Sequence, residues 1–458
     1  MLKFFFEARQ LTKLALPAML LFLSQKSLQF IDALMLGRLG SHALAAVAMG
    51  SAFFLLALMF CLGILSVIGA YISRAFGLNT AREIRRTMQH SFFLVCILAV
   101  PSMGMLWLMP DFLQVIGLDE SIVIATRLFM RGLVWGFPAT LSFLVLREFL
   151  SAFALAKIIL HIGLAAIPLT FFVDYIFIYG KLGMPVLGIA GGGYAGAIVQ
   201  WSMLISLLLY IFYHPLLKSY LFYFDLSDVS WKKMFEMLRM GLPYGVMLVL
   251  DISMGGMAIL MMGYFGADVL AAHYIVVQCL TLVFCLPFSY SMAIAQRISS
   301  TETPSQSVPF IKHIVISALI IMLSLAFFVA ILFNYYSDFL ITLFVGNPAR
   351  NLYLRQFAVT FFTFAAVFQC FDTIQASMNG VLRGVKDTLL PMICSIVGYW
   401  LGIGGAYLFA FYFALGARGV WYGLILGIMF VAVALCVLFS RRAYNYSLLI
   451  LTPSTPCS

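Results

Sequence analysis

Twelve long apolar stretches follow one another along the chain, separated by short polar segments. A helix needs about 20 apolar residues to cross the hydrocarbon core of a bilayer. Strands of a membrane barrel need only about 10 residues and alternate in polarity, unlike these stretches. A helix also satisfies its own backbone polar groups inside lipid. We therefore predict an all-α polytopic membrane protein, with twelve transmembrane helices near residues 14–36, 47–70, 90–110, 124–146, 158–180, 189–213, 236–262, 271–295, 312–334, 356–381, 388–413 and 417–440.

The composition supports a membrane protein and excludes other classes. Hydrophobic residues make up 64% of the 458 residues and charged residues 10%, with a mean hydropathy of +1.07. Soluble domains are nearer half apolar and a quarter charged, so a cytosolic enzyme, a nucleic-acid-binding module and a disordered protein are excluded. The lipid bilayer is the expected partner, nucleic acid is not, and we expect a monomer.

The sequence carries no recognisable catalytic or metal-binding motif. The eight cysteines are scattered without a CxxC spacing, and the six histidines form no HExxH or similar cluster. No His–Asp, Ser–Lys or metal-ligand constellation stands at catalytic spacing. We therefore expect neither an enzyme nor a bound cofactor.

The lysines and arginines predict the orientation of the chain. One set of loops, together with both termini, carries 19 of them, and the opposite set carries 7. Cytoplasmic loops carry the excess of positive charge. Both termini are therefore predicted to be cytoplasmic, which requires an even number of spans. The expected location is the bacterial inner membrane.

The chain also repeats itself. Three motifs recur at a constant offset of 226 residues: Leu16-Pro17 with Leu242-Pro243, Gly37-x-x-Gly40 with Gly263-x-x-Gly266, and Leu44-Ala45-Ala46 with Leu270-Ala271-Ala272. Coincidence in a biased composition does not explain a constant offset. We predict two six-helix lobes, residues 1–213 and 236–458, joined by a cytoplasmic linker at 214–235. An offset of six helices makes the lobes parallel repeats about an axis along the membrane normal, as in transporters that alternate access to a site between two halves.

Four carboxylates lie well inside predicted spans: Asp32, Asp174, Asp251 and Asp372. A charged group at the centre of a span costs about 2.5–3.5 kcal/mol and usually serves an ion, a proton or a substrate. Structural pairing with a cation is the alternative, but the spans offer only Lys26. We therefore predict proton or cation coupling at these four residues.

Other polar side chains share helix faces with the four carboxylates. Gln25 and Asp32 are seven residues apart, and Asp251 is the repeat counterpart of Gln25. Thr170 stands four residues before Asp174. In the tenth span, Asp372 is followed at i+3 and i+7 by Gln375 and Asn379. A hydrogen-bonded helix seam is the alternative for this last stripe.

Lys26 and three prolines complete the candidate set. Lys26 lies about 20 Å beyond Lys13 along the first helix, too deep to reach the interface easily. It either pairs with an acid such as Asp174 across the bundle or is neutral, and it is a candidate for a role in transport. Pro17, Pro168 and Pro243 remove backbone hydrogen bonds and are the predicted hinges.

The motifs together resemble one family over nearly the whole chain. They are Pro17 through Gln25 to Phe30–Gly37, Gly69-Ala70 through Gly77 to Arg85-Arg86, Ile176–Gly180 with Gly188 and Gly191, Gly241-Leu242-Pro243, Ala271-Ala272-His273, and Phe368–Asp372 with Gln375 and Leu382–Thr388. They are similar to spans and loops of the multidrug and toxic compound extrusion (MATE) transporters, in their NorM branch. The tenth-span segment is the most specific of them.

The resemblance implies a cation-coupled antiporter that exports amphipathic, often cationic drugs while sodium or protons enter. It implies coupling at Asp32 and Asp372, and Asp251 stands where the NorM branch carries a glutamate. Thr170 replaces an asparagine, Phe368 a tyrosine, and Lys26 a small or polar residue. Since an ammonium opposes a nearby sodium ion, these departures favour protons in the N-terminal half. Sodium at Asp251 and Asp372 remains open.

A lipid-linked oligosaccharide flippase of the same superfamily is the second hypothesis. Such proteins usually have more spans and a cationic cleft. The four intramembrane acids against one lysine favour cationic ligands instead.

Overall fold

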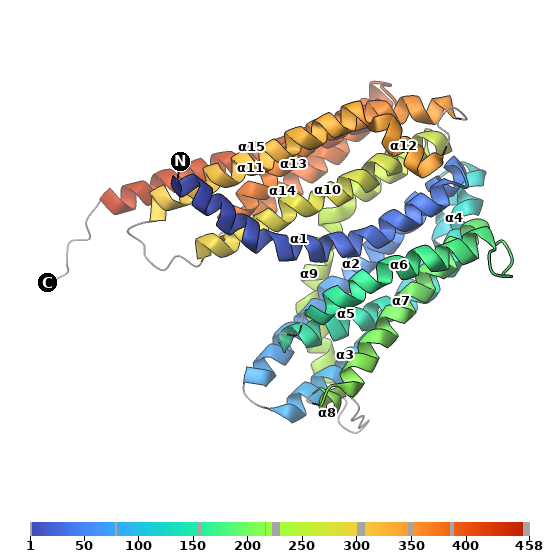
Figure 1. The fold of residues 1–458 in the computed structure, drawn as a ribbon, viewed down its shortest axis with the longest axis horizontal. Coiled ribbons are helices and arrows are strands. Elements are labelled where there is room, and N and C mark those ends of the chain that lie inside the picture. The colour runs from blue at the N-terminus through green and yellow to red at the C-terminus, as the bar shows by residue number, and fades with distance from the viewer. Residues whose placement is uncertain are drawn as a thin grey trace. The chain divides into compact units, whose positions relative to one another are not determined.

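The protein is helical throughout the part that the structure describes. This computed structural model describes residues 2–77, 80–153, 155, 157–215, 217–221, 230–299, 307–346, 351–384 and 389–451, and these contain no strand. The helices (Figure 1) are α1 (Leu2–Gly37), α2 (Ser41–Gly77), α3 (Ala81–Val115), α4 (Glu120–Leu133), α5 (Phe137–Ala152), α6 (Lys157–Tyr179), α7 (Gly188–Tyr213), α8 (Lys218–Leu221), α9 (Trp231–Gly263), α10 (Ala267–Ser299), α11 (Ser307–Tyr335), α12 (Ser337–Val345), α13 (Leu352–Gly384), α14 (Leu389–Tyr407) and α15 (Ala417–Leu451).

The predicted spans are confirmed. Among the described residues, ten helical stretches are long and apolar enough to cross a membrane. The fourth of the predicted spans is α4 and α5 together, and the eleventh is α14 with its continuation. The helices α1 and α9, with 36 and 33 residues, are also long enough to cross. The chain is therefore an all-α polytopic membrane protein with twelve spans.

The helices show details that the hydrophobic pattern does not predict. A 3₁₀ turn, η1 (Val134–Gly136), joins α4 to α5, and a π-helical turn, η5 (Leu408–Tyr412), extends α14. The short helices α8 and α12 lie in segments predicted as loops. They are too short to produce a membrane-span signal in the sequence.

The internal repeat is visible in the backbone. Gly40 and Gly266, at the predicted offset of 226, have φ angles of +118° and +99°. Each begins the next helix in the same way, since its carbonyl accepts from the amide of Leu44 at 3.2 Å or of Leu270 at 3.1 Å. Only glycine adopts such angles without strain. The same sequence motif therefore builds the same turn in both halves.

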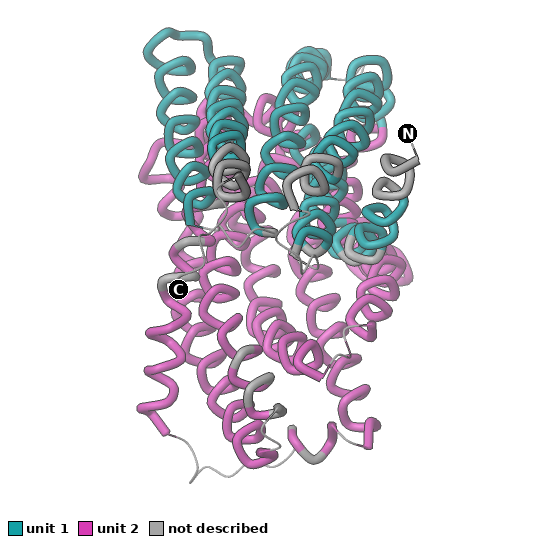
Figure 2. Tube along the Cα trace, turned by 90° about the vertical axis from the view of Figure 1, so that its left-hand side faces the viewer, with its two compact units in different colours: residues 1–26, 275–342, 347–458 teal, residues 27–274, 343–346 magenta. Residues whose placement is uncertain are grey.

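The contacts within the chain divide it into two compact units (Figure 2). Unit 1 contains residues 1–26, 275–342 and 347–458, and unit 2 contains residues 27–274 and 343–346. These units are a different division from the lobes expected from the repeat. The bounds 1–213, 214–235 and 236–458 stay a prediction.

Unit 1 has a core of its own. Here α13 packs against both α11 and α15, and α14 packs against α15. The buried cluster draws Leu11 and Ala15 from α1 and Ile294 from α10. The first part of α1 is further held to α10 by an edge-to-face contact of Phe22 with Phe288, whose ring centroids are 4.7 Å apart.

Unit 2 is built around α2 and α7. The helix α2 packs against α3, α4, α5 and α9, and α7 packs against α4, α5 and α6. The end of α12 also belongs to this unit. Phe344 is fully buried, with its ring 5.2 Å from that of Phe30. A Cβ at Gly37 would come 2.8 Å from the Phe344 carbonyl oxygen, so this close approach requires glycine.

Candidate functional site

In unit 2 the structure brings together two of the four predicted carboxylates. Asp32, on α1, and Asp174, on α6, place their carboxyl groups within hydrogen-bonding reach of one another. The Asp174 side chain is fully buried. Neither of its carboxyl oxygens, nor Oδ1 of Asp32, receives a hydrogen bond from a described residue. The pair therefore lacks the protein donors that normally accompany a buried carboxylate.

The electrostatics of this pair follow from its surroundings. Two negative charges at this distance repel strongly when little water screens them. Carboxylates that share a site do not both stay charged unless a cation lies between them. A buried acceptor without a donor also costs free energy. The pair is therefore suited to hold one shared proton or one small cation.

The neighbouring polar groups position the helices that carry the pair. The hydroxyl of Tyr179 donates to the carbonyl oxygen of Met35 at 2.8 Å, and so ties the end of α6 to α1. The buried Thr170 donates its hydroxyl hydrogen to Ala166 within its own helix at 2.9 Å. The Thr170 oxygen therefore has no hydrogen to offer to Asp174, one turn later. Sequence reasoning included Thr170 but missed Tyr179.

In unit 1, α13 carries the predicted polar stripe. Gln369, Asp372 and Gln375 are buried, and Asn379 is partly buried. Gln375 donates from Nε2 to the Tyr399 hydroxyl of α14 at 2.6 Å, while its own Oε1 is buried without a hydrogen bond to a described residue. This partner shows that part of the stripe is a helix–helix seam, the alternative weighed above.

Asp372 differs from the rest of the stripe. Its side chain is only 8% exposed, and its carboxylate makes no hydrogen bond or ion pair with a described residue. On the same helix, Gln369 donates from Nε2 to the hydroxyl of Thr373 at 3.5 Å. The amide nitrogens of Gln369 and Gln375 thus each donate a hydrogen bond, whereas the Asp372 carboxylate accepts none from a described residue.

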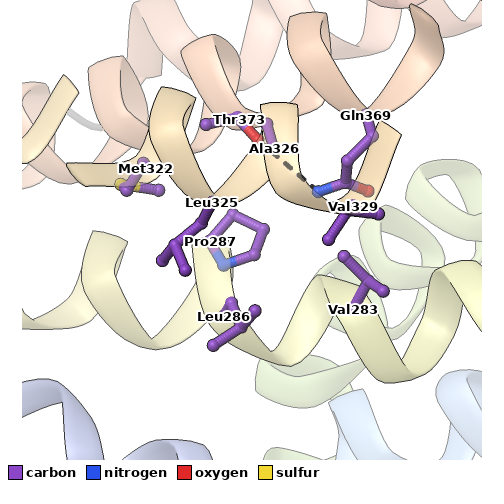
Figure 3. Close-up of a pocket in the computed structure, with 9 residues that line it drawn as sticks. All are labelled: Val283, Leu286, Pro287, Met322, Leu325, Ala326, Val329, Gln369 and Thr373. Carbon is purple, nitrogen blue, oxygen red and sulfur yellow. Dashed lines mark hydrogen bonds between the residues drawn. The ribbon is translucent and has the colours of Figure 1, made fainter. Parts of the chain in front are cut away.

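A small cavity adjoins this part of α13 (Figure 3). It has a volume of about 10 Å³ and lies between α10, α11 and α13. Gln369 and Thr373 contribute its polar wall, and apolar side chains such as Pro287 and Met322 form the rest. Asp372 does not line it. The cavity is therefore a feature beside the predicted carboxylate rather than a binding pocket that contains it.

Lys26 and Gln25 lie in the first part of α1 and are partly buried. The Lys26 ammonium is close enough to the thiol of Cys285, on α10, to interact with it electrostatically. Within unit 1 it has no ion pair with a described acid. The pairing of Lys26 with an acid stays a prediction, as does its role in transport.

The remaining candidates are only partly described. Pro168 lies inside α6, is exposed, and stands six residues before Asp174. Asp251 lies in α9, but its side chain is outside the part that the structure describes. The same holds for the rings of Pro17 in α1 and Pro243 in α9. Pro287, inside α10, is a further helix-interrupting residue that the sequence reasoning missed.

Comparison with known proteins gives consistent relatives. The family model described as MatE matches the chain twice, over residues 17–176 and 243–408, which reproduces the internal repeat. A protein of Pseudomonas putida named "Probable multidrug resistance protein NorM" is 31% identical over 443 residues, 95% of each chain. A Mesorhizobium japonicum protein of the same name is 30% identical over 441 residues, 95% of this chain and 94% of the relative.

Solved structures share the fold. An inward-facing multidrug resistance MATE family transporter of the MOP superfamily has a TM-score of 0.82 at 19% identity, covering 92% of this chain and 95% of its own. The eukaryotic MATE transporter AtDTX14 has a TM-score of 0.70 at 18% identity, covering 98% and 100%.

Proposed function

Because the chain belongs to the MatE family, we propose that it is a cation-coupled antiporter that exports amphipathic, often cationic compounds from a bacterial cell. The observation that carries the proposal is the Asp32–Asp174 pair. It is a buried, mutually repelling pair of carboxyl groups with no described protein donor. Such a pair gains stability whenever a proton or cation occupies it.

The coupling is competition for one negative charge. With the pair deprotonated, the charge attracts a cationic substrate that enters from the cytoplasm. When a proton or a sodium ion arrives from outside, it neutralises the pair and releases the substrate. Binding of either ligand must favour a different conformation for the exchange to do work.

Asp372 is the second proposed coupling residue. It is buried on α13 without a described partner, while the amides around it are engaged in side-chain hydrogen bonds. Asp251, in the same C-terminal repeat as Asp372, joins it in the proposal on sequence grounds alone. The proposed ion at Asp32 and Asp174 is a proton, because Thr170 offers no strong cation ligand. At Asp372 the proposed ion is either a proton or sodium.

The proposed setting follows from the same reasoning. The relatives named NorM are bacterial proteins, and the positive charges predict both termini on the cytoplasmic side. We place the protein in the inner membrane as a monomer, with no resident cofactor beside the transported ion.

The test is gradient-driven transport of a fluorescent cationic dye into inverted membrane vesicles, whose lumen corresponds to the cell exterior. We expect an imposed proton gradient to drive it, and Asp32→Asn and Asp174→Asn each to lower it at least tenfold. Asp111→Asn is the matched control, because Asp111 is an exposed carboxylate of unit 2 paired with Arg127 at 2.6 Å. Dye movement independent of both proton and sodium gradients would overturn the proposal.

A further inference from the structure

A second hollow of unit 1 is lined by none of the proposed coupling residues. It measures about 350 Å³ and runs between α13 and α15. Phe371 and Ile374 of α13 form one wall, and Val433 and Val437 of α15 form the other. The lining is almost entirely apolar apart from its end, where Ser440 and Arg441 lie.

The exposure of the walls shows which way this groove opens. Val433 is 56% exposed and Val437 is 46% exposed. Ala432, which also lines the groove, is only 2% exposed. The floor is therefore closed by helix packing, and the mouth opens on the outer face of the α15 span. In a membrane that face meets lipid, so the natural occupant is a hydrocarbon chain rather than water.

The end of the groove carries an available cation. Arg441, on α15, is exposed and makes no ion pair with a described residue. Its neighbour Ser440 donates its hydroxyl hydrogen back to the carbonyl of Cys436 at 2.9 Å, within the helix. The guanidinium is thus the strong hydrogen-bond donor at this end, and its planar fork suits a phosphate.

The length of the groove matches one leaflet. From Ala432 to Arg441 the helix rises about 14 Å, at 1.5 Å per residue. Half of the ~30 Å hydrocarbon core of a bilayer is about 15 Å. An acyl chain lying along the valines therefore places its headgroup beside Arg441.

We propose that this groove is a binding site for one anionic phospholipid, with an acyl chain between α13 and α15 and its phosphate on Arg441. Lipid covers every outer face of a membrane protein, but here a recessed apolar groove ends at a cation that pairs with no acid among the described residues. Basic pockets between transmembrane helices recognise anionic headgroups in this way. The proposal does not depend on the transport function.

Asp372, on the same helix, does not line the groove. Phe371 and Ile374 flank Asp372 in sequence, but each residue of a helix points about 100° from the one before it. Phe371 and Ile374 therefore point about 100° and about 160° away from Asp372, although Phe371 shares a face with Gln375 one turn later. Loss of the lipid should leave the stripe itself intact.

The test uses the purified full-length protein in detergent, with phosphatidylglycerol or phosphatidylcholine added. Native mass spectrometry counts the bound lipid, and the midpoint of thermal unfolding reports its effect on stability. We expect one tightly held phosphatidylglycerol and no comparable phosphatidylcholine. Arg441→Gln should weaken phosphatidylglycerol binding about fivefold, the equivalent of the ~1 kcal/mol that one cation contributes at an anionic lipid surface.

Two further variants separate the headgroup from the chain. Cys436→Phe fills the groove and should abolish tight retention of phosphatidylglycerol. Lys13→Gln removes an exposed cation of the same unit that does not line the groove, and should leave binding unchanged. Equal retention of both lipids by the wild type, or equal effects of Arg441→Gln and Lys13→Gln, would overturn the proposal. Stabilisation by glycerol phosphate alone, without a chain, would also contradict it.

Discussion

Asp32 and Asp174 come from different helices, yet their carboxyl groups lie within hydrogen-bonding reach of each other and receive no hydrogen bond at three of their four oxygens from a described residue. A shared proton or a small cation supplies what the protein does not. The relationship makes the two residues one functional unit, and this has a measurable consequence.

The effects of Asp32→Asn and Asp174→Asn should not add. Either change removes the repelling pair and with it the site for the coupled ion, so the double variant should transport no worse than the single ones. The measurement is a double-mutant cycle on the initial rate of proton-driven dye efflux. Independent effects that multiply would show that the two carboxylates bind separate ions.

Tyr179→Phe tests the contact that positions the pair. It removes the hydroxyl that donates to Met35 at 2.8 Å. We expect a loss of about 1 kcal/mol in the free energy of unfolding, a typical net value for one hydrogen bond. Efflux should fall less than in Asp32→Asn. The midpoint of thermal unfolding and the efflux rate are the measurements.

Tyr175→Phe is the matched control for this change. Tyr175 lies one turn earlier on α6, with its ring centroid 6.0 Å from that of Tyr179 and no hydrogen bond from its hydroxyl to a described residue. An equal loss in both variants would show that the bond to Met35 contributes nothing specific.

Gly40→Ala and Gly266→Ala should lower the free energy of unfolding by similar amounts. Both glycines have positive φ angles, and at both positions an added Cβ meets no atom within 4 Å. The cost is therefore backbone strain, about 1–3 kcal/mol. Gly104→Ala, inside α3 and equally open, should have no such cost because alanine favours a helix. If Gly104→Ala lowered the free energy of unfolding as much as the other two changes, the positive φ angles would not be the cause of the cost.

The ion pair between Asp338 of α12 and Arg355 of α13 predicts that the stability of the folded protein depends on pH. Arg355 donates from Nε and Nη2 to the two carboxyl oxygens of Asp338, each at 2.7 Å, and these bonds hold the pKa of Asp338 below its ordinary value of 3.8. A lowered pKa in the folded state contributes stability above the unfolded pKa. That contribution is lost as the pH falls below about 4.

Asp338→Asn checks this dependence. Thermal unfolding midpoints of the variant should be slightly lower than those of the wild type at pH 7 and should converge with them in acid. The difference at neutral pH should be small, because both side chains are exposed and water screens the pair. A gap that persists below pH 3 would contradict the assignment.

The hydrophobic pattern predicted the number and place of the spans because each must satisfy a single physical requirement, the thickness of the lipid core. The same requirement says nothing about α12, which is too short to cross. The repeat was predictable from spacing because the turn at Gly40 and Gly266 needs glycine at a fixed place.

The candidate site was predictable as a set of residues but not as a set of pairs. A carboxylate inside an apolar helix is visible in the sequence, as with Asp174. Its partner depends on how α6 packs beside α1, which no local pattern records. The partner of Gln375 was hidden for the same reason, since Tyr399 is one of many tyrosines near a helix face.

The burial of Phe344 beside Gly37 decides where a reporter group can be placed on this protein. The connector after α11 looks like an ordinary loop, but an epitope tag inserted at 343–346 would have to displace a fully buried ring. Residues 181–187, between α6 and α7, are all exposed. A tag placed between Met184 and Pro185 should therefore be tolerated, and would show on intact cells which side of the membrane this connector faces.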